Sequence, residues 1–321
     1  MAFAGTIAEG GAVTRRFLVS NEVSAAMNGH RGIVALETSV IGQGLPVPRN
    51  RDCIRRMSAA IRASDVVPAW IGVVDGSVTV GLSDEQLARF TDPGVASKVA
   101  RRDYPLAVAS GAIGATTVSA TIWAASKAGI TVSATGGIGG VHPGHDPDVS
   151  ADLLELARTP GLLVCSGPKS IIDPAATAEK LEELGVALVG YGVDRLPFFL
   201  AREAPVELEH RVDTPEQSAA VARAVMDLGA PTTVLLCNPI PDAYAMDPVE
   251  VGAAAEEAQA RAEREGVHGK ARTPFLLAAM AELTGGRSLE ANLALLEDNA
   301  RVAGLVAASL AAEPPSAARS G

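Results

Sequence analysis

Two residues that could transfer a proton or form a covalent bond each stand at the end of an apolar run. Lys169 follows "LLVCSGP", and Glu37 ends "IVALE". A lysine at a strand end can bind phosphate, attack a carbonyl as a neutral amine to form an imine, or extend into solvent. A partly desolvated carboxylate favours its protonated form and can donate a proton. Taken alone, however, Glu37 is better explained as a strand-end residue that caps the next segment or pairs with an arginine.

The loop "TGGIGGVHPGHDPDVSAD", residues 135–152, supplies further candidates. Its glycines leave backbone N–H groups free to approach a phosphate, although their spacing is not the dinucleotide fingerprint and a tight turn is the alternative. Carboxylates and imidazoles gather in the same loop and could hold Mg²⁺ or Mn²⁺ rather than zinc: Asp146, Asp148, Asp152, His142 and His145. The simpler interpretation is that Asp148 or Ser150 caps the next helix.

A local positive patch, Lys98 with Arg101 and Arg102, occurs in a chain of net charge −10. It could receive a phosphate or a carboxylate, or could pair with acids on the surface. Asn238 and Asn292 are possible polar anchors for a ligand, or else a turn residue and a helix-surface residue.

The elements that must position these residues alternate between strand and helix. Strands are predicted at 32–38, 130–135, 162–167, 186–192 and 232–238, with a hairpin near residues 69–83 turning at Asp75-Gly76. This alternation predicts an α/β fold, a mainly parallel sheet flanked by helices in α/β/α layers, with a helical C-terminal third. Ligands bind beyond the carboxyl ends of such strands, so Glu37, the loop 135–152, Lys169, Tyr191 and Asn238 are expected at one edge.

Composition excludes several classes of protein. The chain has 321 residues, with 27 basic and 37 acidic side chains and no block of Lys or Arg, so a nucleic-acid partner is not expected. Three separated cysteines and the lack of a leader or an 18-residue apolar run predict a soluble, cytoplasmic protein without a membrane partner. We expect one catalytic domain over 1–312 and a disordered tail at 313–321.

Several segments together resemble one family, the pseudouridine-5′-phosphate glycosidases. They are "VALETSVIGQGLPVPRN", "SKVARRDYP", "GATTVSATIWAASKAGI", "ATGGIGGVHPG", "VSADLLELARTPGLLVCSGPKSI", "CNPIP", "TPFLLAAMAELTGGRSLEANL" and "DNARVAGLVA". They run in family order over about residues 28 to 310. The loop after His142 looks shorter than in the family, and "ETS" replaces the more usual "EST".

The resemblance implies an enzyme that splits the C–C glycosidic bond of pseudouridine 5′-phosphate into uracil and ribose 5-phosphate, with Mn²⁺ and as a homotrimer. By motif position, Lys169 resembles the imine-forming nucleophile and Glu37 the proton donor, while Asp148 matches the metal ligand. The remaining matches are to substrate contacts: Lys98, Val118, His142, Ser150, Ala151 and Asp152.

This resemblance suggests a mechanism. Glu37 would protonate the ring oxygen, the ribose would open, and Lys169 would form an imine at the sugar C1 that stabilises charge as the bond to uracil breaks. Two alternatives remain: an imine-forming phosphosugar aldolase or isomerase, and a non-catalytic nucleotide-binding regulator in which Lys169 and Glu37 have no chemical role.

Overall fold

The strands of the molecule join in one mixed sheet. The structure, a computed structural model, describes residues 16–144 and 148–312. Within these ranges the sheet has eleven strands. They are β1 (Phe17–Val19), β2 (Ile33–Glu37), β3 (Val67–Val74), β4 (Ser77–Val80), β5 (Ser97–Val99), β6 (Gly114–Thr116), β7 (Val132–Ala134), β8 (Gly161–Cys165), β9 (Leu188–Tyr191), β10 (His210–Val212) and β11 (Thr233–Cys237).

The strand order is β1-β4-β3-β2-β7-β8-β11-β9-β10, and β6 pairs with β3 and β5. Only the pairs that β3 makes with β4 and β6 are antiparallel among the described strands. The central ladder is parallel, with Leu36 opposite Ala134 and Ala134 opposite Val164. The predicted mainly parallel sheet is therefore confirmed.

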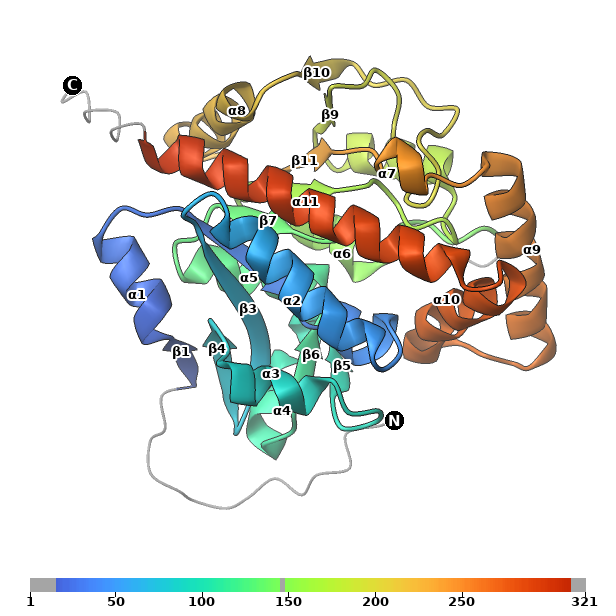
Figure 1. Ribbon diagram of the computed structural model, residues 1–321, viewed down its shortest axis with the longest axis horizontal. Coiled ribbons are helices and arrows are strands. Elements are labelled where there is room, and N and C mark those ends of the chain that lie inside the picture. Colours follow the sequence, from blue (N-terminus) through green and yellow to red (C-terminus); the bar gives the residue numbers. More distant parts are fainter. Residues whose placement is uncertain (1–15, 145–147, 313–321) are drawn as a thin grey trace.

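Helices cover both faces of this sheet (Figure 1). Their bounds are α1 (Asn21–Asn28), α2 (Arg49–Arg62), α3 (Asp84–Phe90), α4 (Tyr104–Ser110), α5 (Val118–Lys127), α6 (Ala151–Leu156), α7 (Pro174–Glu183), α8 (Pro215–Asp227), α9 (Pro248–Arg264), α10 (Arg272–Leu283) and α11 (Arg287–Ala312). Four short helical segments are η1 (Val40–Gly44), η2 (Arg101–Asp103), η3 (Asp242–Tyr244) and η4 (Gly269–Ala271).

Alternating side chains along the strands divide the core in two. Leu162 and Val164 of β8 join the hydrophobic cluster that contains α2, α8 and α11, whereas Leu163 and Cys165 join the cluster of α5, α6 and α7. The long helix α11 lies beside α2 across one face of the sheet, with α5 and α6 on the far side (Figure 1). The sheet is thus buried on both faces, which explains its continuous apolar strands.

The long predicted elements are found close to their expected positions. The hairpin of β3 and β4 turns at Asp75-Gly76, and the C-terminal helices α9, α10 and α11 are present. The three cysteines are buried and free, as their spacing predicted. The strands β1, β5, β6 and β10 were not predicted: each has three residues, and none lies in a long apolar run of the kind that marks β7.

Two expectations about organisation stay predictions. The tail at 313–321 lies outside the described residues. The single catalytic domain over 1–312 is an inference from the sequence. No helix in the described ranges has the length and apolar content needed to cross a membrane.

The turn after β8 is set by Gly167. Its φ is +76°, and a Cβ there would lie 2.0 Å from the carbonyl oxygen of Pro197. A side chain at this position therefore meets two obstacles, a left-handed backbone and a fixed main-chain atom. This glycine allows the chain to turn toward Lys169.

We expect Gly167→Ala to lower the free energy of unfolding by more than about 2 kcal/mol, because backbone must move to admit the methyl group. Gly111→Ala is the matched control: its φ is +66°, with open space around the position of a Cβ. That control should cost about 1 kcal/mol. Urea unfolding of both variants measures the difference, and equal losses would contradict the steric explanation.

Candidate active site

The predicted site residues line one cavity of about 270 Å³ at the carboxyl ends of β2, β7 and β8. They come from strands, loops and helix starts that are far apart in the sequence: Glu37, Lys98, Val118, His142, Asp148, Ser150, Ala151, Asp152 and Lys169. The parallel ladder brings them together, as expected for this type of sheet. Their individual roles stay predictions.

Glu37 is the last residue of β2 and is buried. One carboxylate oxygen, Oε2, accepts a hydrogen bond from Ser39 Oγ at 2.6 Å, and the other accepts from Thr135 Oγ1. Thr38 turns away and donates to Ile71 O at 2.7 Å, so the hydroxyl beside Glu37 in "ETS" belongs to Ser39. Because a hydroxyl can donate or accept, these partners suit either protonation state of Glu37.

Lys169 lies in the turn between β8 and α7. Its Nζ donates to Gly137 O at 2.6 Å, and its backbone N–H donates to Ile138 O at 3.0 Å. The helix α7 begins only at Pro174, where Asp173 caps it. Lys169 therefore precedes the first turn of α7, and a main-chain carbonyl holds its amine.

Asp152 links the loop to two neighbouring segments. Its Oδ1 accepts from Ser119 N at 3.0 Å, and its Oδ2 accepts from Gly139 N at 3.1 Å. Ser150 caps α6 by accepting from Asp152 N. A Cβ at Gly139 would lie 2.4 Å from Ser150 Oγ, so this glycine is needed for close packing. The capping interpretation is confirmed for Ser150.

A basic wall faces these carboxylates. Lys98 and Arg102 line the cavity together with Lys270 of η4. Burial lowers the pKa of Lys98, and the nearby charge of Lys169 lowers it further, whereas Asp152 and Glu37 oppose the shift. Lys270 Nζ donates to Asp103 Oδ2 at 2.8 Å, which joins η4 to the segment that carries Lys98. Several cations at one wall of a cavity favour an anionic ligand.

His142 and Asp148 form another corner of the cavity. The backbone N–H of His142 donates to Asp148 O at 2.9 Å, and Arg272 Nη1 lies 3.6 Å from Asp148 Oδ2. Burial lowers the pKa of His142, which Asp148 opposes and Arg272 reinforces. His142 Nδ1 is buried without a hydrogen-bond partner in the described structure. The imidazole of His142 and the carboxylate of Asp148 are thus available as ligands for a cation.

Across residues 16–144 and 148–312, no three acidic, histidine or cysteine side chains gather as a metal site. His145 and Asp146 of the predicted cluster lie outside the described residues. Asp152 of that cluster is already bound to two main-chain N–H groups.

Some parts of the cavity were not predicted from the sequence. The start of α10 and the preceding η4 form a wall with Gly269, Lys270, Thr273, Pro274 and Leu277, and Gln43 of η1 also lines the cavity. The residues of η4 and α10 do not directly follow a strand, so position in the sheet could not identify them. Asn292 lines the cavity, and its buried Oδ1 has no hydrogen-bond partner among the described residues. Tyr191 and Asn238 are not part of the lining in the described ranges.

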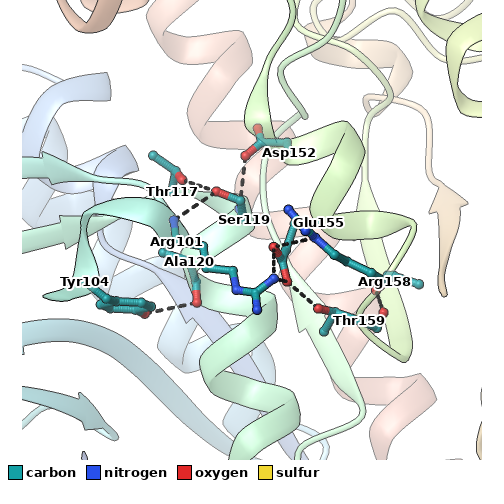
Figure 2. Close-up of polar contacts among 10 residues, drawn as sticks. Arg101, Tyr104, Thr117, Ser119, Ala120, Asp152, Glu155, Arg158 and Thr159 are labelled. Atoms are coloured by element: carbon teal, nitrogen blue, oxygen red, sulfur yellow. Dashed lines mark hydrogen bonds and ion pairs between the residues drawn. The ribbon is translucent and has the colours of Figure 1, made fainter. Parts of the chain in front are cut away.

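A polar network joins the segment that carries Arg101 to the helices α5 and α6 (Figure 2). Glu155 of α6 is 1% exposed, and both of its carboxylate oxygens accept from Arg101 Nη1, at 3.0 and 2.9 Å. The Arg101 guanidinium also lies over the Trp123 ring, 5.8 Å from its centre. The backbone N–H of Arg101 donates to Ser119 Oγ at 3.4 Å, and Ser119 is already bound to Asp152. Arg101 thereby fixes the segment of Lys98 and Arg102 against α5 and α6.

Arg158 provides a test of this interpretation, because it approaches the same Glu155 carboxylate at 3.5 Å without reaching the Lys98 segment. We expect Arg101→Met to lower the free energy of unfolding by about 2 to 3 kcal/mol, since a buried carboxylate loses its main partner. Arg158→Met should cost less than about 1 kcal/mol. Urea unfolding compares the two variants, and a larger loss in Arg158→Met would contradict this assignment.

The sequence matches known proteins over most of its length. A family model described as "Indigoidine synthase A like protein" matches residues 22–309. A protein of Herpetosiphon aurantiacus named pseudouridine-5′-phosphate glycosidase is 47% identical over 92% of this chain and 98% of its own length. A protein of Photorhabdus laumondii named pseudouridine-5′-phosphate glycosidase 2 is 44% identical over 92% of this chain and 96% of its own length.

Two solved structures share the fold. An indigoidine synthase A-like protein of Thermotoga maritima superposes with a TM-score of 0.85 at 35% identity, over 94% of this chain and all of the other. The prealnumycin C-glycosynthase AlnA, solved with ribulose 5-phosphate, gives 0.84 at 40% identity over 93% of this chain and 98% of the other. The chain therefore belongs to the family it resembles in sequence, the pseudouridine-5′-phosphate glycosidases with the indigoidine synthase A-like proteins.

Proposed function

We propose that this protein cleaves the C–C glycosidic bond of pseudouridine 5′-phosphate to give uracil and ribose 5-phosphate. The observation that carries the proposal is the meeting of Lys169, Glu37 and a basic wall in one cavity. A phosphosugar needs cations for its phosphate, an acid for its ring oxygen and, for this bond, a group that can take up electrons. The AlnA structure with ribulose 5-phosphate shows that a relative binds a pentose phosphate.

The bond to be broken dictates the need for a lysine. Protonating a leaving oxygen or nitrogen is sufficient for ordinary glycosides, but uracil is linked here through carbon. A nitrogen attached to C1 of the sugar can donate its lone pair as the C–C bond breaks, and so replaces the missing leaving-group ability. Lys169 lines the cavity, and its amine is oriented by a main-chain carbonyl, Gly137 O.

The proposed steps use only groups around the cavity. Glu37 gives a proton to the ring oxygen and the ribose opens, after which neutral Lys169 bonds to C1. The Lys169 nitrogen passes a proton to the Glu37 carboxylate and then forms a C=N bond as the bond between C1 and the uracil carbon breaks. The uracil carbon takes that proton from Glu37. Water hydrolyses the imine, which releases ribose 5-phosphate and restores the amine. Ser39 and Thr135 follow the change at Glu37 by exchanging donor and acceptor roles.

The proposal includes Mn²⁺ and a homotrimer, both inferred from the family resemblance. Asp148 would be the protein carboxylate that holds the ion. His142 Nδ1, which has no hydrogen-bond partner among the described residues, would be a second ligand, and waters would complete the shell. When bound, the ion would supply positive charge that polarises oxygens of the substrate.

We expect wild-type protein with Mn²⁺ to release uracil from pseudouridine 5′-phosphate, and Lys169→Ala to lower kcat by at least about 10³-fold because the electron sink is lost. Lys180→Ala is a matched control from α7, where an exposed lysine pairs with Glu183. Borohydride should trap a substrate adduct on the wild type and on the control, but not on Lys169→Ala. Absorbance and mass spectrometry measure the two effects.

Other results would identify a different function. Uracil release that survives Lys169→Ala would rule out the imine mechanism. No uracil under any divalent metal would reject the substrate. In that case, trapping of ribose 5-phosphate would favour a phosphosugar aldolase or isomerase, and its absence would favour a non-catalytic nucleotide-binding protein.

A pH dependence follows from Lys98. Its pKa is lowered from 10.5, so as the pH rises Lys98 loses its positive charge at a lower pH than free lysine does. Because the substrate phosphate stays dianionic there, KM should rise roughly tenfold between about pH 7 and about pH 10. Lys98→Arg should remove this rise, since arginine stays charged. Steady-state kinetics across the pH range checks it, and an unchanged profile in Lys98→Arg would contradict it.

A further inference from the structure

A buried asparagine of α11, Asn299, has no role in the proposed chemistry, yet its side chain is fully bonded. Asn299 is 0% exposed. Its Nδ2 donates to Thr135 O at 2.9 Å, to Gly136 O at 3.3 Å and to Ser166 Oγ at 3.0 Å. These acceptors belong to the turns that follow β7 and β8, the strands that lead to the reacting groups. Buried polar groups with this many partners fix the segments they bind.

The orientation of this amide is determined by its neighbours. Asn238 Nδ2 donates to Asp298 Oδ2 at 2.8 Å and to Asn299 Oδ1 at 3.0 Å. Since a carboxylate only accepts, Asp298 forces Asn238 to present its NH₂ group, which in turn directs Oδ1 of Asn299 toward Asn238. The Asn299 Nδ2 must then face the carbonyls of the loop.

The loop held by Asn299 touches both reacting side chains. Thr135 Oγ1 donates to the Glu37 carboxylate, and Gly137 O accepts from Lys169 Nζ. A Cβ at Gly137 would lie 2.7 Å from Phe199 Cδ2, so the segment is also packed tightly on its other side. A shift of this loop would therefore move the acid and the amine together.

A different network holds the substrate-binding wall. Lys98 is positioned through Arg101 and Glu155, and Asp152 is bound by Ser119 and Gly139. None of these contacts includes Asn299. Asn299 thus bonds the part of the loop next to Glu37 and Lys169, whereas the segment of Lys98 is held through Arg101 and Glu155.

We propose that Asn299 is a positioning residue for the reaction: by holding the carbonyls of Thr135 and Gly136, it sets Glu37 and Lys169 at their working distance from the sugar. This inference rests on the proposed function. Misplacement of reacting groups by about 1 Å costs about 10²-fold in rate. Loss of Asn299 should thus reduce kcat while KM stays within about twofold.

The test compares Asn299→Ala with the wild type and with Thr233→Val. Thr233 is buried at the opposite end of β11 from Asn238 and donates to Thr159 O at 2.5 Å. This control loses a buried side-chain to main-chain hydrogen bond without touching the loop. Uracil release, KM, the rate of borohydride trapping with ribose 5-phosphate and Tm are measured for each protein.

We expect Asn299→Ala to lower both kcat and the trapping rate by about 10²-fold, with KM nearly unchanged. Thr233→Val should lower Tm but leave both rates as in the wild type. Asn238→Ala leaves Asn299 in place but removes the donor that orients it, so it should show a smaller loss of the same kind. It replaces Asn299→Ala if that variant does not fold.

A conservative variant gives a signature that loss of packing would not. In Asn299→Asp the ionised carboxylate repels the loop carbonyls, but the protonated form can donate to one of them. The ratio of its kcat to that of the wild type should therefore rise as the pH falls. A flat ratio, an unchanged kcat in Asn299→Ala, or equal changes in kcat and KM would overturn the inference.

Failure of the proposed function would be distinguishable. If the wild type releases no uracil, the assigned substrate is wrong. Trapping of ribose 5-phosphate needs only Lys169 and its positioning, so a comparison of Asn299→Ala with the wild type still decides the role of Asn299. If Asn299→Ala and the wild type trap ribose 5-phosphate equally well, or if neither traps it, the positioning role of Asn299 is rejected.

Discussion

The site depends on the parallel main-chain ladder that joins β2, β7 and β8. Each of these strands ends at the same edge, so Glu37, Thr135 and the turn to Lys169 meet without any long-range side-chain contact having to bring them there. Backbone hydrogen bonds fix strand ends more firmly than loops can fix themselves. Side-chain hydrogen bonds then fix individual side-chain atoms at these strand ends. A reaction that needs an acid and an amine around one sugar requires positioning at that level.

Charge is distributed unevenly around the cavity. The chain is acidic overall, yet Lys98, Arg102 and Lys270 gather at one wall. Three cations at one wall make that side of the cavity electrostatically favourable for an anion. The acidic side chains that face them, Glu37 and Asp152, are occupied by hydroxyl or main-chain donors. A phosphorylated ligand would therefore interact mainly with the basic wall.

Much of the fold and the edge that holds the site could be predicted from the sequence, because long apolar runs and helical periods mark β2, β8, β11 and α11 clearly. Position after a strand predicted Glu37 and Lys169 as neighbours in the cavity. The wall from η4 and α10 could not be found this way, since helix packing rather than strand register places it. Asn238 shows the same limit: its position after a strand is right, but its partners, Asp298 and Asn299, come from α11.

The helix α11 has a further consequence for the way the protein forms. It carries Asn292 to the cavity and Asn299 to the loop beneath it, although the sheet and most other walls are complete earlier in the chain. Domains emerge from the ribosome from the N-terminus at about 5 to 20 residues per second. The sheet can begin to pair during that time, but the loop that contacts Glu37 and Lys169 gains its hydrogen bonds from Asn299 only after the last described helix has been synthesised. Incomplete chains would thus lack catalytic activity, because Lys169 would be present but not yet held in place.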